Sequence, residues 1–253
     1  MTKVTVREGL EWREGGERRA RLLGLLGGGK DGAFGTKRVC EVCAEATAVS
    51  GAGIMLMSDE VPQGSLCTTN EMSNVIEQLQ YALGEGPCVD AYRQDWPVRE
   101  PDLAHPETPR WLAFAPPAIE VGVRAVFGFP LQVGAVRLGA LNLCCDRVGP
   151  LSDDQHADAL VMADIAAQAV LVLQTGAPPG KLAAALGAGA DFHYVVHQAA
   201  GMVAAQLGVS VREALVRLRA YAFGNDRPLT EVAQGVVGRK MRFDAVSGEV
   251  YHR

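Results

Sequence analysis

The sequence lacks an apolar segment long and continuous enough to cross a membrane. Its most apolar long stretch, residues 157–173, is interrupted by Asp158, Asp164 and Gln168, whereas a membrane helix needs about 20 predominantly apolar residues. The N-terminal segment is charged, and the apolar patch after it is short and full of glycine, so no signal peptide is expected. These absences favour a cytoplasmic protein without a membrane partner.

Catalytic and metal-binding motifs are also missing. No glycine-rich phosphate loop is present, and no nucleophile has a general base near it in the sequence. The six cysteines do not form the framework of a secreted domain. Cys40 and Cys43 form a CxxC pair, but helical spacing places Cys43 on a buried stripe, and no second pair completes a zinc site. We therefore expect no enzyme, no metal and no cofactor.

Charge is scarce overall and unevenly distributed. The 253 residues carry a net charge of −5, so the protein is not basic throughout. Residues 195–253 contain eight basic and five acidic side chains, a net charge of +3, which leaves −8 for residues 1–194. An acidic body with a mildly basic C-terminal segment indicates a polyanionic partner for that segment only.

Residue patterns predict an α+β domain in the first two thirds of the chain. Residues 1–36 are rich in Gly, Glu and Arg and are expected to be mobile, with one helical piece at 17–26. The expected order after them is a helix at 36–49, strands at 52–57 and 65–69, a helix at 71–84 ending at Gly84, a loop at 84–88, a strand near Val98, strands at 123–133 and 136–145, and a long helix capped by Ser152. This order indicates an antiparallel sheet with flanking helices.

The segment from Lys37 to Leu173 resembles a GAF domain. The resemblance rests on three stretches: LGEGPCVDAYRQDWPVREPDL, FAPPAIEVGVRAVFGFPL, and GALNL before the last helix. It implies a sensor domain over residues 37–174, with a pocket on one face of the sheet that takes a small ligand or docks a partner. The Asn-Lys-Phe-Asp-Glu pattern of the branch that binds cyclic nucleotides is missing, which disfavours cyclic AMP and cyclic GMP.

Four side chains are candidates for that pocket, namely Cys88, Trp96, Trp111 and Phe127. Each also has a purely structural interpretation. No Lys, Arg or His adjoins Cys88 in the sequence to lower its pKa, and buried structural cysteines are commoner than reactive ones. Large apolar side chains such as the two tryptophans fit a core equally well.

Residues 191–245 form a predicted three-helix domain, preceded by a linker at 175–190 and followed by a tail at 246–253. Gly208 ends the first helix, Ser210 and Glu213 form a capping box for the second, and Thr230 caps the third. The inward faces are Val196, Ala199, Val203 and Leu207 on the first helix; Val211, Ala214, Leu215, Leu218 and Ala222 on the second; and Leu229, Val232, Ala233, Val236 and Val237 on the third.

The arginines of the second helix flank its buried stripe. At 100° per residue, Arg212 and Arg219 lie together on one side, and Arg217 and Tyr221 lie together on the other. Arg227 follows in the next turn. Taken singly, each arginine fits a solvated helix face.

The same residues resemble an ANTAR domain, the RNA-binding unit named for the AmiR and NasR antitermination regulators. The matches are Gln198-Ala199, Gly201-Met202, Leu207-Gly208, Glu213-Ala214, Leu218-Arg219, Ala222, Leu229 and Val232-Ala233. The sequence departs from the family at His197, where an acid is usual, and at Ala200, where a lysine is usual, and the missing lysine removes a candidate phosphate contact.

The two resemblances together imply a signal-responsive transcription antitermination regulator. Its ANTAR-like domain would bind an RNA hairpin in a nascent transcript under control of the GAF-like domain. The candidate RNA-binding residues are Gln198, Arg212, Arg217, Arg219, Tyr221 and Arg227, with the arginines on phosphates and Tyr221 stacked on a loop base. Two alternatives stay open: a helix-turn-helix protein that binds duplex DNA, and a protein-interaction module that binds no nucleic acid.

The long helix after Ser152 indicates a homodimer. Its apolar face comprises Ala159, Leu160, Ala163, Ala166, Ala167, Val170 and Leu171, more than one sheet needs to cover. We expect part of this face to pair with a second copy. The alternative is that the helix covers only its own sheet and the chain is monomeric.

Overall fold

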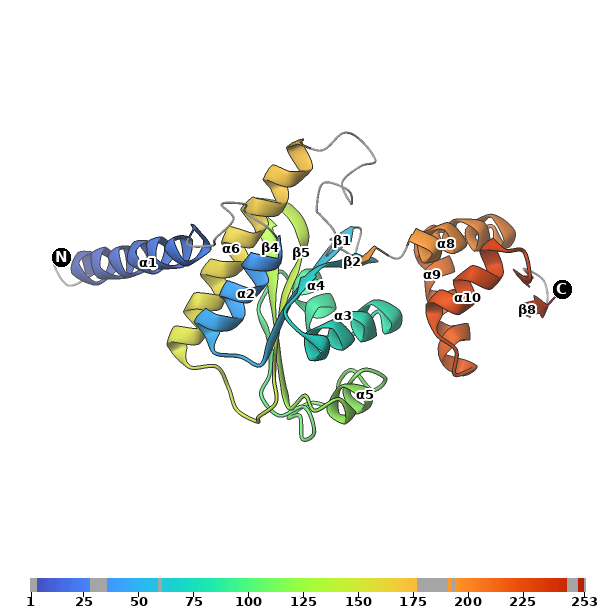
Figure 1. The fold of residues 1–253 in the computed structure, drawn as a ribbon, viewed down its shortest axis with the longest axis horizontal. Helices are drawn as coiled ribbons and strands as arrows, with labels where there is room; N and C mark the ends of the chain where they lie inside the picture. Colours follow the sequence, from blue (N-terminus) through green and yellow to red (C-terminus); the bar gives the residue numbers. More distant parts are fainter. Residues whose placement is uncertain are drawn as a thin grey trace.

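The computed structural model describes residues 4–27, 36–58, 61–176, 191–192, 194–244 and 250–252. Most of the predicted linker (175–190) and of the predicted tail (246–253) lies outside these ranges. The described residues form a sheet domain (36–176, with the strand at 191–192) and a C-terminal module (194–244, with 250–252). Figure 1 shows the sheet domain in the middle of the molecule and the module beside it.

A six-stranded sheet organises the first domain. Its strand order is β3 (Val98–Glu100), β4 (Ala125–Val133), β5 (Val136–Cys145), β1 (Gly51–Ser58), β2 (Val61–Thr68) and β6 (Asp191–Phe192). All five neighbouring pairs are antiparallel. The expected α+β class with an antiparallel sheet is confirmed. The edge strand β6 was not expected, and it directly precedes the C-terminal module.

Helices cover both faces of the sheet. On one face lie α2 (Thr36–Thr47) and α6 (Asp153–Gly176), and on the other lie α3 (Glu71–Leu83), α4 (Pro87–Gln94) and α5 (Ala115–Glu120) (Figure 1). Strand residues alternate between the two cores because successive side chains point to opposite faces. Phe127 packs with α6, and its neighbour Val126 packs on the α3 face.

Local signals account for most helix boundaries. The side chain of Ser152 accepts a hydrogen bond from the backbone N–H of Gln155, whose amide oxygen accepts one from the N–H of Ser152, so the predicted cap of α6 is confirmed. Gly84 adopts a left-handed conformation, φ 69°, and ends α3. The loop expected at 84–88 is shorter than predicted, because the short helix α4 begins at Pro87.

The N-terminal segment contains a long helix, α1 (Val4–Gly27). The helical piece expected at 17–26 lies within α1, which is longer than expected, and the mobility of the segment stays a prediction. Arg18 donates to Asp154 and Asp158 of α6, and Arg19 pairs with Asp164. Sequence periodicity missed this helix because ion pairs to a distant element, rather than an apolar stripe alone, hold it in place.

The C-terminal module has the three predicted helices, α8 (Tyr194–Leu207), α9 (Val211–Gly224) and α10 (Leu229–Val237), followed by an unpredicted hairpin of β7 (Met241–Phe243) and β8 (Val250–His252). Across the described ranges, no single helix is long and apolar enough to span a membrane; α8 and α9 reach that length and apolarity only as a pair, bent by 105°.

Candidate nucleic-acid interface

The module is a small helical core built on the predicted inward faces. Ala199 and Ala214 are fully buried, as expected. The hydroxyl of Ser210 accepts a hydrogen bond of 3.1 Å from the N–H of Glu213, which confirms the predicted cap of α9. Two details were wrong. Val211, in the first turn of α9, is 54% exposed, and α10 begins two residues earlier than expected, with Pro228 rather than Thr230 at its cap position.

Two of the candidate arginines pair with acids that are near them in the sequence. Arg217 donates to Glu213 and Arg227 donates to Glu231, each at 2.8 Å and each four residues apart. Exposed pairs of this kind contribute little to stability. A phosphate oxygen can therefore replace either carboxylate without unfolding the module.

The other candidates lie around these two. Gln198 on α8 and Arg212 on α9 are exposed. Tyr221 is half-buried and packs edge-on against Phe243 of the hairpin, with ring centres 5.7 Å apart. Because its ring already has a partner, base stacking on Tyr221 would use only the part of the ring that Phe243 leaves uncovered.

Arg219 faces the sheet domain instead of solvent. Its Nη2 donates a hydrogen bond of 2.6 Å to the carbonyl oxygen of Tyr81 on α3, and its guanidinium lies 5.9 Å from the centre of the Tyr81 ring. Burial lowers the pKa of Arg219 to about 10. The wheel pairs Arg219 with Arg212, but in this structure only Arg212 is exposed.

Further contacts join α3 and β2 to the module. The ring of His197 lies edge-on to Tyr81, with centres 6.2 Å apart, and its Nε2 is 3.3 Å from the carbonyl oxygen of Gln63. Beside them is a pocket of about 290 Å³, lined by Val75, Gln78, Leu79, Tyr81 and Ala82 of α3 and by Pro228, Leu229 and Thr230 of the module. The interface is thus polar at Arg219 and loosely packed next to it.

The four candidate residues for a ligand pocket in the sheet domain do not converge. Cys88 and Trp111 belong to the core on the α3 face, whereas Phe127 belongs to the core on the opposite face. Trp96 is 69% exposed. The proposed grouping is therefore wrong, because the alternation along β4 turns Phe127 towards α6 and Trp96 lies in the exposed turn before β3.

Cys88 and Trp111 are held by structural contacts. The backbone N–H of Cys88 donates to the side-chain oxygen of Gln80 at 2.7 Å, and burial raises the pKa of the Cys88 thiol well above its ordinary value. The indole N–H of Trp111 donates to Asp90 at 2.8 Å. Cys88 is therefore a buried, protonated thiol and not a nucleophile.

Buried polar side chains mark the α3 face more clearly than the predicted residues do. Glu77 and Gln80 of α3 and Asn142 of β5 are each at most 1% exposed. Burial raises the pKa of Glu77 to about 8, and the Asn142 amide beside it lowers that pKa in part. The polar residues of α3 interrupt an otherwise amphipathic pattern, which is the signal that could have identified them. In the part of the chain that the structure describes, no group of three or more His, Cys, Asp or Glu is arranged to hold a metal ion.

Comparison with protein families assigns both parts of the chain. A GAF domain model matches residues 36–171, and an ANTAR domain model matches residues 185–237. The chain belongs to the GAF–ANTAR regulators. Its sheet domain is the GAF domain, and the helices of its C-terminal module are the ANTAR domain. No curated protein matches the chain significantly.

Solved GAF domains resemble the chain distantly. The GAF domain of a phosphoenolpyruvate-protein phosphotransferase from Coxiella burnetii is 14% identical over 64% of this chain and 95% of its own, with a TM-score of 0.48. The corresponding domain from Acinetobacter is 10% identical over 71% and 99%, with a TM-score of 0.46. The assignment rests on the family models and not on these structures.

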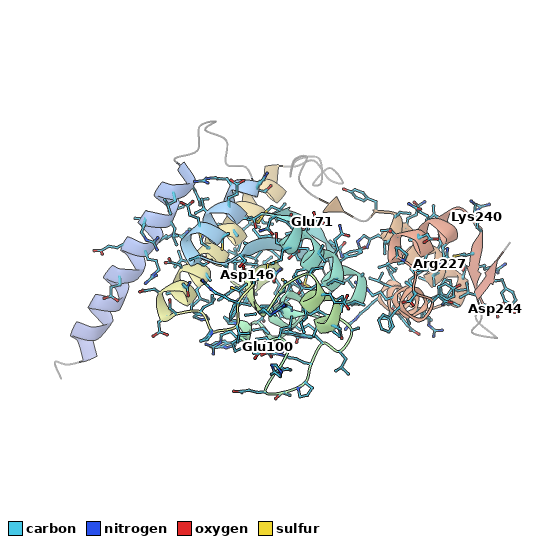
Figure 2. All side chains as sticks on the ribbon, turned by 60° about the horizontal axis from the view of Figure 1, so that its bottom comes forward. Glu71, Glu100, Asp146, Arg227, Lys240 and Asp244 are labelled. Carbon is cyan, nitrogen blue, oxygen red and sulfur yellow. A yellow bond between two sulfur atoms is a disulfide. The ribbon has the colours of Figure 1, made fainter. Side chains whose placement is uncertain are left out.

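The ANTAR match ends at Val237, directly before a basic cluster that the sequence analysis did not select. Arg239, Lys240 and Arg242 are all exposed, and they flank Met241, which is buried against the ANTAR core. The Sδ atom of Met241 lies 3.9 Å from Nη1 of Arg227. Figure 2 shows Arg227 and Lys240 on this end of the molecule. The basic surface of the ANTAR domain therefore extends onto the C-terminal hairpin.

The burial of residue 200 accounts for the missing lysine of the ANTAR pattern. Ala200 is fully buried, so a lysine there would have to leave the core to reach a phosphate. Within the described part of the C-terminal module, the exposed basic side chains lie instead on α9 and around the start of the hairpin, with the half-buried Arg227 in the turn before α10.

Proposed function

We propose that the chain is a signal-responsive regulator that binds RNA hairpins in nascent transcripts through its ANTAR domain, under control of its GAF domain. The proposal rests on one observation: the arginines of the ANTAR domain differ in their surroundings. Arg212, Arg217 and Arg227 reach the surface, whereas Arg219 donates to Tyr81 of the GAF domain.

The exposed basic residues fit a nucleic-acid backbone. Arginine side chains bind phosphates through charged, directional hydrogen bonds, and sequence-specific RNA recognition favours loops with unstacked bases. Gln198 and Tyr221 are the residues proposed to contact such bases. Binding is proposed to prevent a terminator from forming, which places the protein in the cytoplasm with the transcript. Recognition suffices for this role, and no catalytic step is assigned to the chain.

The proposed route of control runs through α3. One side of this helix carries Glu77, which is buried beside β1, and Gln80, which is buried beside the start of α4. Its C-terminal end carries Tyr81 and the cap residue Gly84, which lie beside Arg219. A ligand that shifts α3 on the sheet side would move the carbonyl that holds Arg219. A ligand changes the equilibrium between two states only through a difference in affinity for them, and the two sides of α3 provide that link.

A homodimer is part of the proposal, because two linked modules on two hairpins gain avidity through effective concentration. The apolar face of α6 that remains available for a second copy is smaller than expected. Ala159, Ala163, Ala166, Ala167 and Val170 are buried within their own domain, while Leu160 remains 44% exposed. Sedimentation of the full chain, alone and with a two-hairpin RNA, should show a dimer, and a clean monomer in both samples would exclude it.

One observation favours the DNA-binding alternative. α8 and α9 meet at 105° across a three-residue turn, residues 208–210, which is the geometry of a helix-turn-helix. An acid, Glu213, pairs with Arg217 on the outer face of α9, where a recognition helix would approach phosphates and base edges. The same acid would face the phosphates of an RNA hairpin, so a direct comparison of hairpin RNA with duplex DNA is needed to separate the two proposals.

In vitro selection tests the proposal without knowledge of the natural target. The full chain is presented with a random RNA pool, and bound molecules are sequenced over successive rounds. The proposal predicts enrichment of stem-loops that share loop bases. Enrichment without common secondary structure, or none at all, would contradict it.

A further inference from the structure

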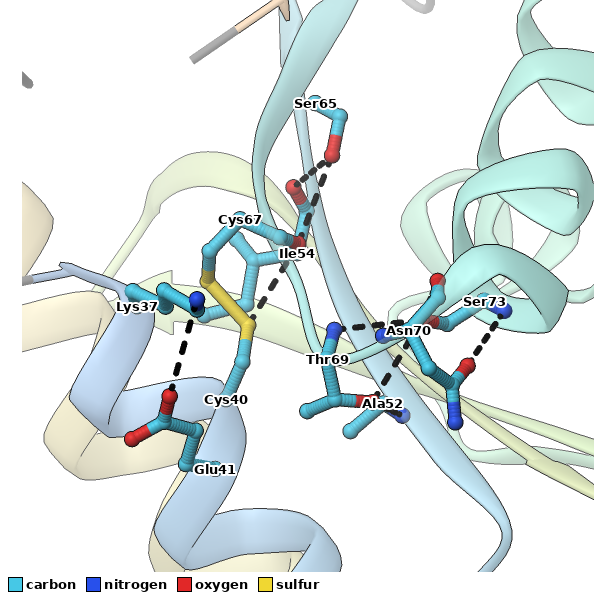
Figure 3. Close-up of a disulfide and its surroundings, with 10 residues drawn as sticks. All are labelled: Lys37, Cys40, Glu41, Ala52, Ile54, Ser65, Cys67, Thr69, Asn70 and Ser73. Atoms are coloured by element: carbon cyan, nitrogen blue, oxygen red, sulfur yellow. Dashed lines mark hydrogen bonds and ion pairs between the residues drawn. A yellow bond between two sulfur atoms is a disulfide. The ribbon is translucent and has the colours of Figure 1, made fainter. Parts of the chain in front are cut away.

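A disulfide joins Cys40 of α2 to Cys67 of β2. The two residues are 27 positions apart in the sequence, and their Cα atoms are 6.4 Å apart. Both side chains are buried, at 0% and 2% exposure. Figure 3 shows the bond crossing from the helix to the strand. The sequence interpretation, which treated Cys40 only as half of a CxxC pair, did not foresee this bond.

The other four cysteines lack the features of a redox site. Cys43, Cys88, Cys144 and Cys145 are free and buried. Burial is the main cause that raises the pKa of each of these thiols. Reactive cysteines need a stabilised thiolate, so these four remain protonated and inert. Redox chemistry in this chain is confined to the bonded pair.

The bond lies close to the strand that carries the ANTAR domain. Cys67 pairs with Ile54 of β1, and an irregularity in β2 separates it from Ser65, which pairs with Asp191 of β6. The Ser65 hydroxyl lies 3.3 Å from the carbonyl oxygen of Cys67 (Figure 3). β6 ends at Phe192, and α8 begins at Tyr194. The disulfide therefore anchors β2 to α2, and β2 pairs with β6, the strand that directly precedes the ANTAR domain.

An apolar pocket lies beside the segments that carry the bond. The pocket has a volume of about 290 Å³ and lies between α1, α2, α6 and the sheet. Val39 and Leu66, the immediate sequence neighbours of Cys40 and Cys67, are among its lining residues. Neither cysteine lines the pocket and both are buried, so a thiol of low molecular weight reaches a sulfur atom only when α2 or β2 opens locally.

We propose that Cys40 and Cys67 form a reversible redox site whose co-reactant is a low-molecular-weight thiol and its disulfide. The thiolate of one small thiol attacks a sulfur of the pair, forms a mixed disulfide and releases the other cysteine as a thiolate. A second small thiolate attacks the mixed disulfide, releases the small-molecule disulfide and frees the first cysteine. Two small thiols are oxidised, the protein disulfide takes up two electrons and two protons, and the reverse exchange restores the bond.

The proposal gives the redox state a consequence for the ANTAR domain, and this part rests on the proposed function. A regulator that meets nascent RNA shares a compartment in which thiols are kept reduced, where disulfides are usually transient and catalytic or redox-sensing. Removing the cross-link restores freedom to α2 and β2 and makes local opening easier. Reduction then loosens the β2–β6 pairing from which the ANTAR domain extends.

The test uses the full chain equilibrated with defined ratios of reduced and oxidised glutathione. Free thiols are trapped with a maleimide and assigned by peptide mass spectrometry, and hydrogen exchange is followed on β2 and β6. Cys40 and Cys67 should become labelled together as the ratio is made more reducing, while the protein stays folded. Exchange at residues 64–67 and 191–192 should become several-fold faster in the reduced protein.

Matched variants separate the outcomes. Cys43→Ser, one turn along α2, should keep the redox response, and the double variant Cys40→Ser, Cys67→Ser should exchange like the reduced protein at every ratio. A pair that resists glutathione until the protein unfolds, or unchanged exchange on reduction, would overturn the proposal. Because neither readout involves RNA, failure of RNA binding would contradict the proposed function and leave the redox result intact.

Discussion

The guanidinium of Arg219 and the carbonyl oxygen of Tyr81, 138 positions apart in the sequence, are joined by a hydrogen bond of 2.6 Å. Tyr81 lies on the helix that lines the buried face of the GAF domain, and Arg219 lies on the helix proposed to bind RNA. One contact thus joins the proposed sensing element to the proposed binding surface. We infer that the GAF domain withholds Arg219 from RNA in this conformation.

Opening this contact should raise RNA affinity. A Cβ atom at Gly84 would lie 2.6 Å from Nη1 of Arg219, so Gly84→Ala should displace the guanidinium and strengthen hairpin binding by the full chain several-fold. Gly134→Ala is the matched control, because Gly134 also has a positive φ, 59°, but no neighbour within 4 Å of a new Cβ. Fluorescence anisotropy measures both variants. Equal affinities would show that the contact does not restrain binding.

Reversing the charge of Arg219 should weaken RNA binding. RNA binding is proposed to release Arg219 from Tyr81, and in that bound state Arg219→Glu removes one phosphate contact. The slope of log K against log salt should then become less steep by about 0.7–0.9. Lys37→Glu is the control, since Lys37 is an exposed residue of α2 in the GAF domain. Titrations at several salt concentrations, with circular dichroism to check folding, measure the effect. An unchanged affinity and slope would assign Arg219 to the domain interface alone.

Glu77 should make stability depend on pH. Burial raises its pKa from 4.5 to about 8, so between these values the folded state holds a proton that the unfolded state has lost. Stability therefore falls as pH rises from about 5 to about 8, by up to about 1.4 kcal/mol per pH unit. Glu77→Gln should flatten this slope in urea unfolding, whereas Glu120→Gln, at an exposed position, should keep it. A parent protein with flat stability across this window would refute the assignment.

The ANTAR core should not tolerate a larger side chain at position 214. Ala214 is fully buried on α9, and Ala214→Leu should destabilise the domain by about 1–3 kcal/mol through overpacking. Ala220→Leu, on the exposed side of the same helix, is the control. Thermal unfolding followed at 222 nm compares the two. Identical melting temperatures would show that the inward face is misassigned.

Local sequence signals were sufficient for the fold class and for several helix ends. Gly84, Ser152 and Ser210 fix helix ends through interactions within a few residues, and the alternation of β4 and β5 sets the two faces of the sheet. The helix ends depend on the chain near each residue, which is why capping rules predicted them.

The remaining features depend on contacts between distant segments. Nothing near Cys40 in the sequence identifies Cys67 as its partner, since the bond requires α2 to pack beside β2. The ion pairs that order α1 involve acids of α6, such as Asp158. The helical wheel placed Arg219 correctly beside the buried stripe of α9, but only the docking of α3 shows that this flank is covered.

The most direct test of the account is the affinity of the full chain for a hairpin RNA and for a duplex DNA of matched length, measured across a range of salt concentrations. The account predicts tighter binding to the hairpin at every salt concentration, with a salt dependence that reports several phosphate contacts. Equal or tighter binding to the duplex DNA, or no binding to either, would contradict it.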